Sequence, residues 1–281
     1  MNKIIVCAAA TSLCCVSMAT PVVQNVVLTQ NADRTVVVTY DLSGEDAVVT
    51  ADILTNGVSI GGCHLTHMDG DVNRFVALGN GKKQFTWKPF AAWPEQKVAL
   101  DNVRAEVKAW SKHCPPDYML VSLTVANTGR YYESVGTLPF NPTSDLCKTE
   151  YLLMRKIHAA NVMWRMGSPS TEAWRFDTGI ETPHIVTLAN DYYIGVYPVT
   201  QRQWELVKGD KPAQFNNAAD YPTRPIETIR YCDVRGGSGY EWPDNRTTVA
   251  DDSFLGRLRK HTGSSGFDLP LEAQWEFAAR A

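Results

Sequence analysis

Residues 22–125 alternate between apolar and polar side chains with a period of two, which constrains the fold more than any other feature of the sequence. The alternation predicts half-buried β-strands, because successive side chains of a strand point to opposite faces. The pair Asn56-Gly57 favours a tight hairpin, because both residues tolerate positive φ. Short strands at this spacing predict an antiparallel β-sandwich of immunoglobulin or fibronectin style, with Trp87 in its core. The expected strands are 26–28, 34–40, 47–54, 84–87, 103–110 and 118–123.

Helix signals become frequent in the second half of the chain. Thr200 and Gln203 form a capping box, which predicts a helix over 201–207. A second helix is expected over 253–261, with Asp252 or Ser253 as its N-cap and Gly263 as its stop. Between the two halves, residues 126–160 carry glycines and prolines and are interpreted as a connector.

The last segment predicts a helix that begins near Leu271. Leu271, Trp275, Ala278 and Ala279 fall at helical spacing and give one apolar face. The sequence stops without a glycine cap or a following proline. We therefore expect the Trp275 face to be uncovered in a fragment of this kind.

Several segments in the second half resemble one known family in their order along the chain. They are Met166-Gly167-Ser168-Pro169, the strand 181–188, the segment 193–204, the strand 224–229 and the closing stretch 267–281. These segments resemble the formylglycine-generating enzyme, or sulfatase-modifying factor, family over residues 161–281. The resemblance implies the first half of a C-type-lectin-like α+β module. The expected organisation is thus α+β, with a signal peptide at 1–19, a β-sandwich domain at 20–125, a connector at 126–160 and a truncated module at 161–281.

The resemblance also implies a chemistry. Active members of that family oxidise a cysteine of an exported sulfatase to formylglycine with oxygen and copper, and copper(I) favours paired thiolate ligands. In the family, the cysteine pair and most of the calcium-binding residues lie beyond the position that matches Ala281. Within the segment of this chain that resembles the family, Cys232 is the one cysteine. We therefore assign no catalytic, cofactor-binding or metal residue to this chain, and copper and calcium are implied for a complete module alone. The implied partner is a sulfatase or another exported protein.

The N-terminus has the pattern of an export signal. Lys3 is followed by an apolar stretch over 4–16, and Ser17 and Ala19 are small residues at the expected cleavage positions. The pattern predicts cleavage after Ala19 and a secreted or periplasmic protein, the alternative being a buried N-terminal helix or strand. No later apolar run is long enough to span a membrane. The formal net charge of −3 gives no basic field for nucleic acid.

Four cysteines remain after removal of the signal: Cys63, Cys114, Cys147 and Cys232. An even number in an oxidising compartment allows three disulfide arrangements, of which we favour a Cys63–Cys114 bridge.

Other polar residues are weaker candidates for a site. The segment Cys63-His64-Leu65-Thr66-His67 could bind a metal, although a surface loop with a disulfide is the favoured interpretation. His184 is expected to be a packed or hydrogen-bonded histidine, and Asp251 and Asp252 to be helix caps. Three function classes stay open: a fragment of a formylglycine-generating-like protein, a divergent relative with lectin-like binding or non-haem iron chemistry, and a surface interaction protein that binds through its β-sandwich.

Overall fold

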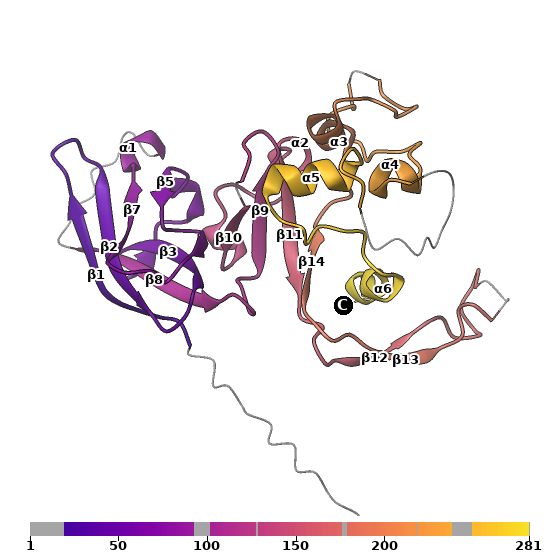
Figure 1. Cartoon of the computed structure of the whole chain (residues 1–281), viewed down its shortest axis with the longest axis horizontal. Coiled ribbons are helices and arrows are strands. Elements are labelled where there is room, and N and C mark those ends of the chain that lie inside the picture. Colours follow the sequence, from indigo (N-terminus) through magenta and orange to yellow (C-terminus); the bar gives the residue numbers. More distant parts are fainter. Residues whose placement is uncertain are drawn as a thin grey trace, which may run out of the picture.

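The computed structural model describes residues 20–92, 102–127, 129–175, 179–217, 219–237 and 249–280 (Figure 1). These residues form a mixed α+β structure with mostly antiparallel sheets and few helices. The predicted signal peptide of residues 1–19 lies outside the described residues.

Two sheets in the first part of the chain share one hydrophobic core. One has the order β1-β2-β7-β5, and the other has β3 at its centre, paired with β8 on one side and with β4 and β6 on the other. The bounds are β1 Val22–Gln30, β2 Val36–Ser43, β3 Ala47–Thr55, β4 Val58–Ser59, β5 Met68–Gly70, β6 Arg74–Val76, β7 Lys83–Trp87 and β8 Val103–Ser111. The strands predicted at 26–28, 34–40, 47–54, 84–87 and 103–110 are confirmed. Asn56 and Gly57 both adopt positive φ in the β3–β4 hairpin, as predicted.

The alternation along β2 explains this core. Val36, Val38 and Tyr40 point inward, while the residues between them are half-buried. Trp87 is fully buried, as predicted, and its Nε1–H donates to the His64 carbonyl oxygen at 2.9 Å. The short helices α1 (Pro89–Ala92) and η1 (Gly62–His64) lie at the ends of these strands.

A third sheet occupies the middle of the chain, in the order β10-β9-β11-β14. Its strands are β9 (Tyr118–Ser122), β10 (Gly129–Tyr132), β11 (Tyr151–Ile157) and β14 (Tyr192–Gly195). The strand predicted at 118–123 exists, but it pairs with β10 and β11 instead of completing the sandwich. The segment predicted as a connector contributes β10, β11, η3 (Val135–Thr137) and α2 (Leu146–Thr149). Alternation predicts that a segment is a strand, but it carries no information on the sheet that the strand joins.

Helices α3 (Gln201–Lys208) and α5 (Phe254–Thr262) pack on the same face of this sheet through Trp204, Phe254 and Leu258. Both hydrogen bonds of the predicted capping box are present at the N-terminus of α3. Gln203 N donates to Thr200 Oγ1, and Thr200 N donates to Gln203 Oε1. Ser253 caps α5, and the helix ends at Gly263 in the left-handed conformation, as expected. The remaining helices are α4 (Tyr231–Arg235) and α6 (Glu272–Arg280).

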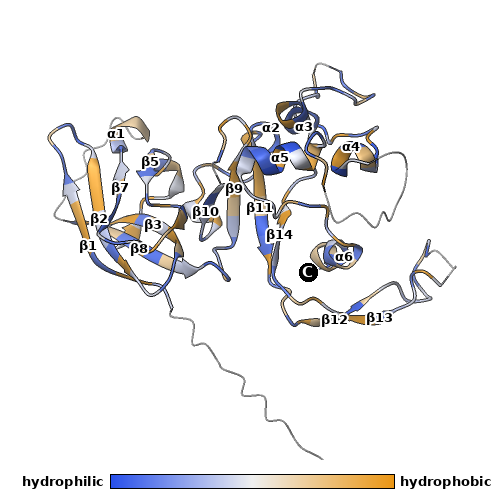
Figure 2. Cartoon of the chain, in the orientation of Figure 1, coloured by the Kyte–Doolittle hydropathy of each residue, from blue (hydrophilic) through white to orange (hydrophobic). Residues whose placement is uncertain are grey.

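A two-stranded arm extends from the third sheet toward one side of the molecule in Figure 1. It consists of β12 (Met163–Met166) and β13 (His184–Thr187), and Figure 2 shows hydrophobic residues along both strands. One face of the arm packs on α6, where the Trp164 and Phe277 rings meet edge to face with centroids 5.4 Å apart. The Gly167 N–H also donates to Glu276 Oε1 at 2.9 Å, so α6 holds the base of the arm.

Candidate functional site

An open groove of about 1440 Å³ lies between the third sheet, α5 and α6. We call it the β14 groove, because residues 191–199, which include all of β14, line it without a gap. Much of its apolar lining comes from the sheet, from α5, from the segment 267–270 and from α6. Among these residues are Met119, Val121, Leu152, Met154, Ile194, Val196, Leu255, Leu258, Phe267, Leu269 and Trp275.

Strand register brings the floor of the β14 groove together. Met119 lies opposite Met154, and Val121 lies opposite Leu152, on neighbouring strands β9 and β11. Directly paired residues share one face of a sheet, so these four side chains point the same way. On β14, Gly195 pairs with Met154 of β11 and places no side chain on this face. The floor formed by these four side chains is therefore apolar.

A network of charged residues fixes one wall of the groove. Arg235 Nε and Nη2 donate to the two carboxylate oxygens of Asp268 at 2.7 and 2.8 Å. Arg259 Nε donates to the Phe267 carbonyl oxygen at 2.7 Å. The hydrogen bonds from Arg235 lower the pKa of Asp268. The segment 267–270 is thus held as a preformed wall, and the Asp268 charge is neutralised.

Helix α6 forms the other wall and exposes its apolar face. The Tyr192 hydroxyl on β14 donates to the Gln274 carbonyl oxygen and ties the helix to the edge of the sheet. Trp275 is 61% exposed and Leu271 is 66% exposed, although both are large apolar residues. The exposed Trp275 face expected from the sequence is confirmed.

A polar cluster lies at one end of the groove. His158 Nε2 lies 3.1 Å from Asp117 Oδ1, and His158 Nδ1 lies 3.5 Å from Asp191 Oδ2. The buried Lys156 Nζ lies 3.4 Å from Asp117 Oδ1. Partial burial opposes ionisation of Asp191, but hydrogen bonds from the Ala160 and Ala159 N–H groups outweigh it and lower the pKa of Asp191. The cluster ties together the end of β11 and the starts of β9 and β14.

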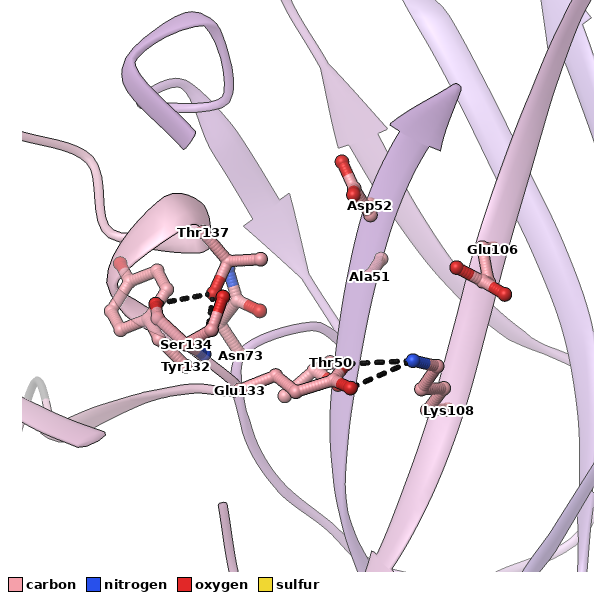
Figure 3. A pocket seen from close by; sticks show the side chains of 10 residues that line it. All are labelled: Thr50, Ala51, Asp52, Asn73, Glu106, Lys108, Tyr132, Glu133, Ser134 and Thr137. Carbon is pink, nitrogen blue, oxygen red and sulfur yellow. Dashed lines mark hydrogen bonds and ion pairs between the residues drawn. The ribbon is translucent and has the colours of Figure 1, made fainter. Parts of the chain in front are cut away.

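A second, smaller pocket of about 160 Å³ lies where β10 and η3 meet β3 and β8 (Figure 3). Its lining is polar, and Lys108 Nζ donates to Glu133 Oε1 at 2.8 Å across it. The hydrogen bond that Lys108 donates to Glu133 raises the pKa of Lys108. Asp52 and Glu106 add two carboxylates, but within the described ranges no group of three or more histidine, cysteine or acidic residues could hold a metal ion.

The cysteine prediction needs correction. Cys63 and Cys114 are both exposed free thiols, and so no bridge joins them. Cys63 lies in η1, whereas Cys114 Sγ lies 3.8 Å from Lys156 Nζ on the third sheet. Cys147 is a buried free thiol, and burial raises its pKa to about 11. Cys232 is a free thiol in α4.

The other candidates from the sequence are spread over the molecule. His64 and His67 belong to η1 and the loop after it, and neither lines the β14 groove. His184 is exposed on the arm, with Nδ1 2.9 Å from the Thr182 carbonyl oxygen. Ser253, and neither Asp251 nor Asp252, caps α5. The assignment of no catalytic, cofactor-binding or metal residue stays a prediction. Sequence reasoning found one wall of the β14 groove through Trp275 and missed its floor, which depends on strand register.

Comparisons with known proteins give one partial match. Chaperone protein LppX of Paenibacillus barcinonensis is 37% identical over 109 residues, which are 34% of this chain and 37% of that protein. The chain thus spans little more than a third of the length of the curated relative that it matches. No family model matches the chain, and no solved structure matches it significantly.

These comparisons correct the family resemblance. The chain was expected to be a sulfatase-modifying factor related to formylglycine formation, but no family model supports this, and the curated relative is named a chaperone. The structure gives local reasons for the short motifs. Gly167 has a φ of 95°, which glycine adopts readily, and Thr200 and Gln203 make a helix cap. Turns and caps of this kind recur in unrelated folds, so the matches do not establish a family.

Proposed function

We propose that this protein binds apolar segments of other exported polypeptides in the β14 groove, in the manner of a chaperone. The observation that carries the proposal is the groove itself, an open channel of about 1440 Å³ beside a sheet edge with an exposed Trp275. Exposed apolar surface of this extent marks interaction sites in soluble proteins.

The chemistry of the groove favours a polypeptide over a small polar ligand. Its charged lining residues are Arg74, Arg130, Asp191 and Asp268, which sum to no net charge. Its methionines, Met119 and Met154, are flexible and polarisable, and side chains of this kind suit varied apolar partners. The name of the curated relative is consistent with such a role, although that protein matches over a third of this chain.

Aggregation of reduced insulin tests the proposal. Equimolar protein is expected to delay the rise in light scattering, and Trp275→Ser is expected to shorten that delay, because it removes the largest apolar side chain of the α6 wall. Trp174→Ser is the matched control, since Trp174 is fully exposed on the arm and does not line the groove. The proposal would be contradicted if the protein did not delay aggregation, or if both variants changed the delay equally.

We also propose that the protein is exported, with cleavage after Ala19 to give a secreted or periplasmic product. The support is the sequence pattern of residues 1–19. In the described part of the chain, no helix has the length and apolar character needed to cross a bilayer. Mass spectrometry of protein from the extracellular or periplasmic fraction should give an N-terminus at Thr20, and an uncleaved Met1 would contradict the proposal.

Two finer statements on the fold are likewise proposals. The shared core of the first two sheets supports an immunoglobulin- or fibronectin-style sandwich. The support for a C-type-lectin-like arrangement of the second half is its mixture of short strands and helices. Because β9 pairs with β10 and β11, we place the division between the halves between β8 and β9.

A further inference from the structure

We propose that the bound polypeptide adds to β14 as an extra antiparallel strand. This inference rests on the proposed function and specifies how the groove binds its partner. Strand addition to a free sheet edge is a common mode of peptide recognition, in which main-chain hydrogen bonds supply affinity and side-chain pockets supply selectivity. Strand β14 is an edge strand, because its sheet has the order β10-β9-β11-β14.

The hydrogen-bond register shows which backbone groups of β14 face the groove. The Val196 N–H donates to the Leu153 carbonyl oxygen at 2.9 Å, so this pair is hydrogen-bonded. Hydrogen-bonded and non-bonded pairs alternate along an antiparallel ladder. Ile194 therefore bonds toward β11, whereas the N–H and C=O groups of Tyr193 and Gly195 point away from it. Within the described residues, no other segment bonds to these outward groups.

The shape of the groove agrees with this direction. Residues 191–199, which include all of β14, line it together with the apolar floor on β9 and β11. The groove therefore borders the free edge of β14, where a further strand would lie about 4.8 Å from β14.

The same geometry selects the side chains of the added strand. A residue that bonds to Tyr193 or Gly195 has its side chain on the face that carries Met154, because paired residues share a face. Gly195 is exposed and adds no side chain on that face, where the Tyr197 carbonyl oxygen lies 2.9 Å from the position that a Cβ would take. The charged lining residues sum to no net charge, so the groove as a whole favours neither sign. The occupant is thus an uncharged, extended segment of another polypeptide with apolar residues at every second position.

N-methylated peptides test the inference without altering the protein. The probe is a fluorescein-labelled heptapeptide of alternating Thr and Val, titrated with the full chain by fluorescence anisotropy. Methylation of the Val nitrogens is expected to weaken binding on the order of tenfold or more, because those N–H groups donate to β14 and each hydrogen bond contributes about 1 kcal/mol. Methylation of the Thr nitrogens is the matched control and is expected to preserve binding.

The outcomes separate this inference from the proposed function. If both methylated peptides bind as well as the parent peptide, the groove holds side chains alone, and strand addition is wrong while the proposed function stands. If the parent peptide does not bind and the protein also fails to delay insulin aggregation, both are wrong. Binding that Val methylation weakens and that Trp275→Ser also weakens supports both.

Discussion

At the scale of single residues, Trp87 shows how one side chain stabilises the first core. It is fully buried between the two sheets, and its indole N–H satisfies the His64 carbonyl oxygen. Trp87→Phe leaves that carbonyl without its donor and opens a small cavity. We therefore expect the free energy of unfolding to fall by about 2–4 kcal/mol. Urea unfolding measures this loss. The fully exposed Trp174 is the control, and Trp174→Phe should change stability by less than about 0.5 kcal/mol; an equal effect of the two substitutions would disprove the account.

Sequence reasoning succeeded for residues whose role is local. The caps Thr200 and Ser253 and the turn at Asn56 depend on neighbours within a few positions. It failed for Cys63 and Cys114, because proximity between residues far apart in sequence is set by the fold. It also gave no sign of the buried Lys156, whose ammonium is satisfied by the distant Pro115 carbonyl oxygen at 2.5 Å.

At the scale of elements, an ionised carboxylate ties α3 to the segment that follows it. Glu205 accepts hydrogen bonds from Tyr221 and Arg202 and pairs with Lys211, and these contacts, the Tyr221 bond foremost, lower its pKa to about 2 from 4.5. A depressed folded-state pKa gives stability that is present above pH 4.5 and is lost as the pH falls toward 2. Thermal unfolding of Glu205→Gln should therefore depend less on pH in this window than that of the wild type. Substitution of the exposed Glu172, Glu172→Gln, serves as the control. If the unfolding temperatures of the wild type and of Glu205→Gln depended on pH identically, Glu205 would not have this stabilising role.

Element type could be predicted better than element pairing. Long runs of strand-forming residues identified β2, β3 and β8, which span eight or nine residues each. The four-residue strands β10, β12 and β14 are too short for a period to stand out. The floor of the β14 groove depends on the register of β9, β11 and β14, so it could not be predicted from the sequence.

At the scale of the whole molecule, β10 connects the first hydrophobic core to the part of the chain that holds two further cores. The Tyr131 N–H donates to the Asn73 carbonyl oxygen at 2.7 Å, and Arg130 Nη1 donates to the Val72 carbonyl oxygen at 3.0 Å. The first core draws its residues from β1 to β8, whereas the cores around Trp204 and Leu153 draw theirs from β9 onward. A few polar contacts therefore join two bodies that bury their apolar side chains separately.

This separation predicts two unfolding transitions. Trp87 reports on the first core, and Trp204, which stacks on Phe254 with ring centroids 4.8 Å apart, reports on the second. In urea unfolding followed by circular dichroism, Trp87→Phe should shift one transition and Trp204→Phe the other. Substitutions in non-contacting cores have independent effects when the bodies unfold separately. A single transition that both substitutions shift together would mean that the β10 junction couples the whole chain into one cooperative unit.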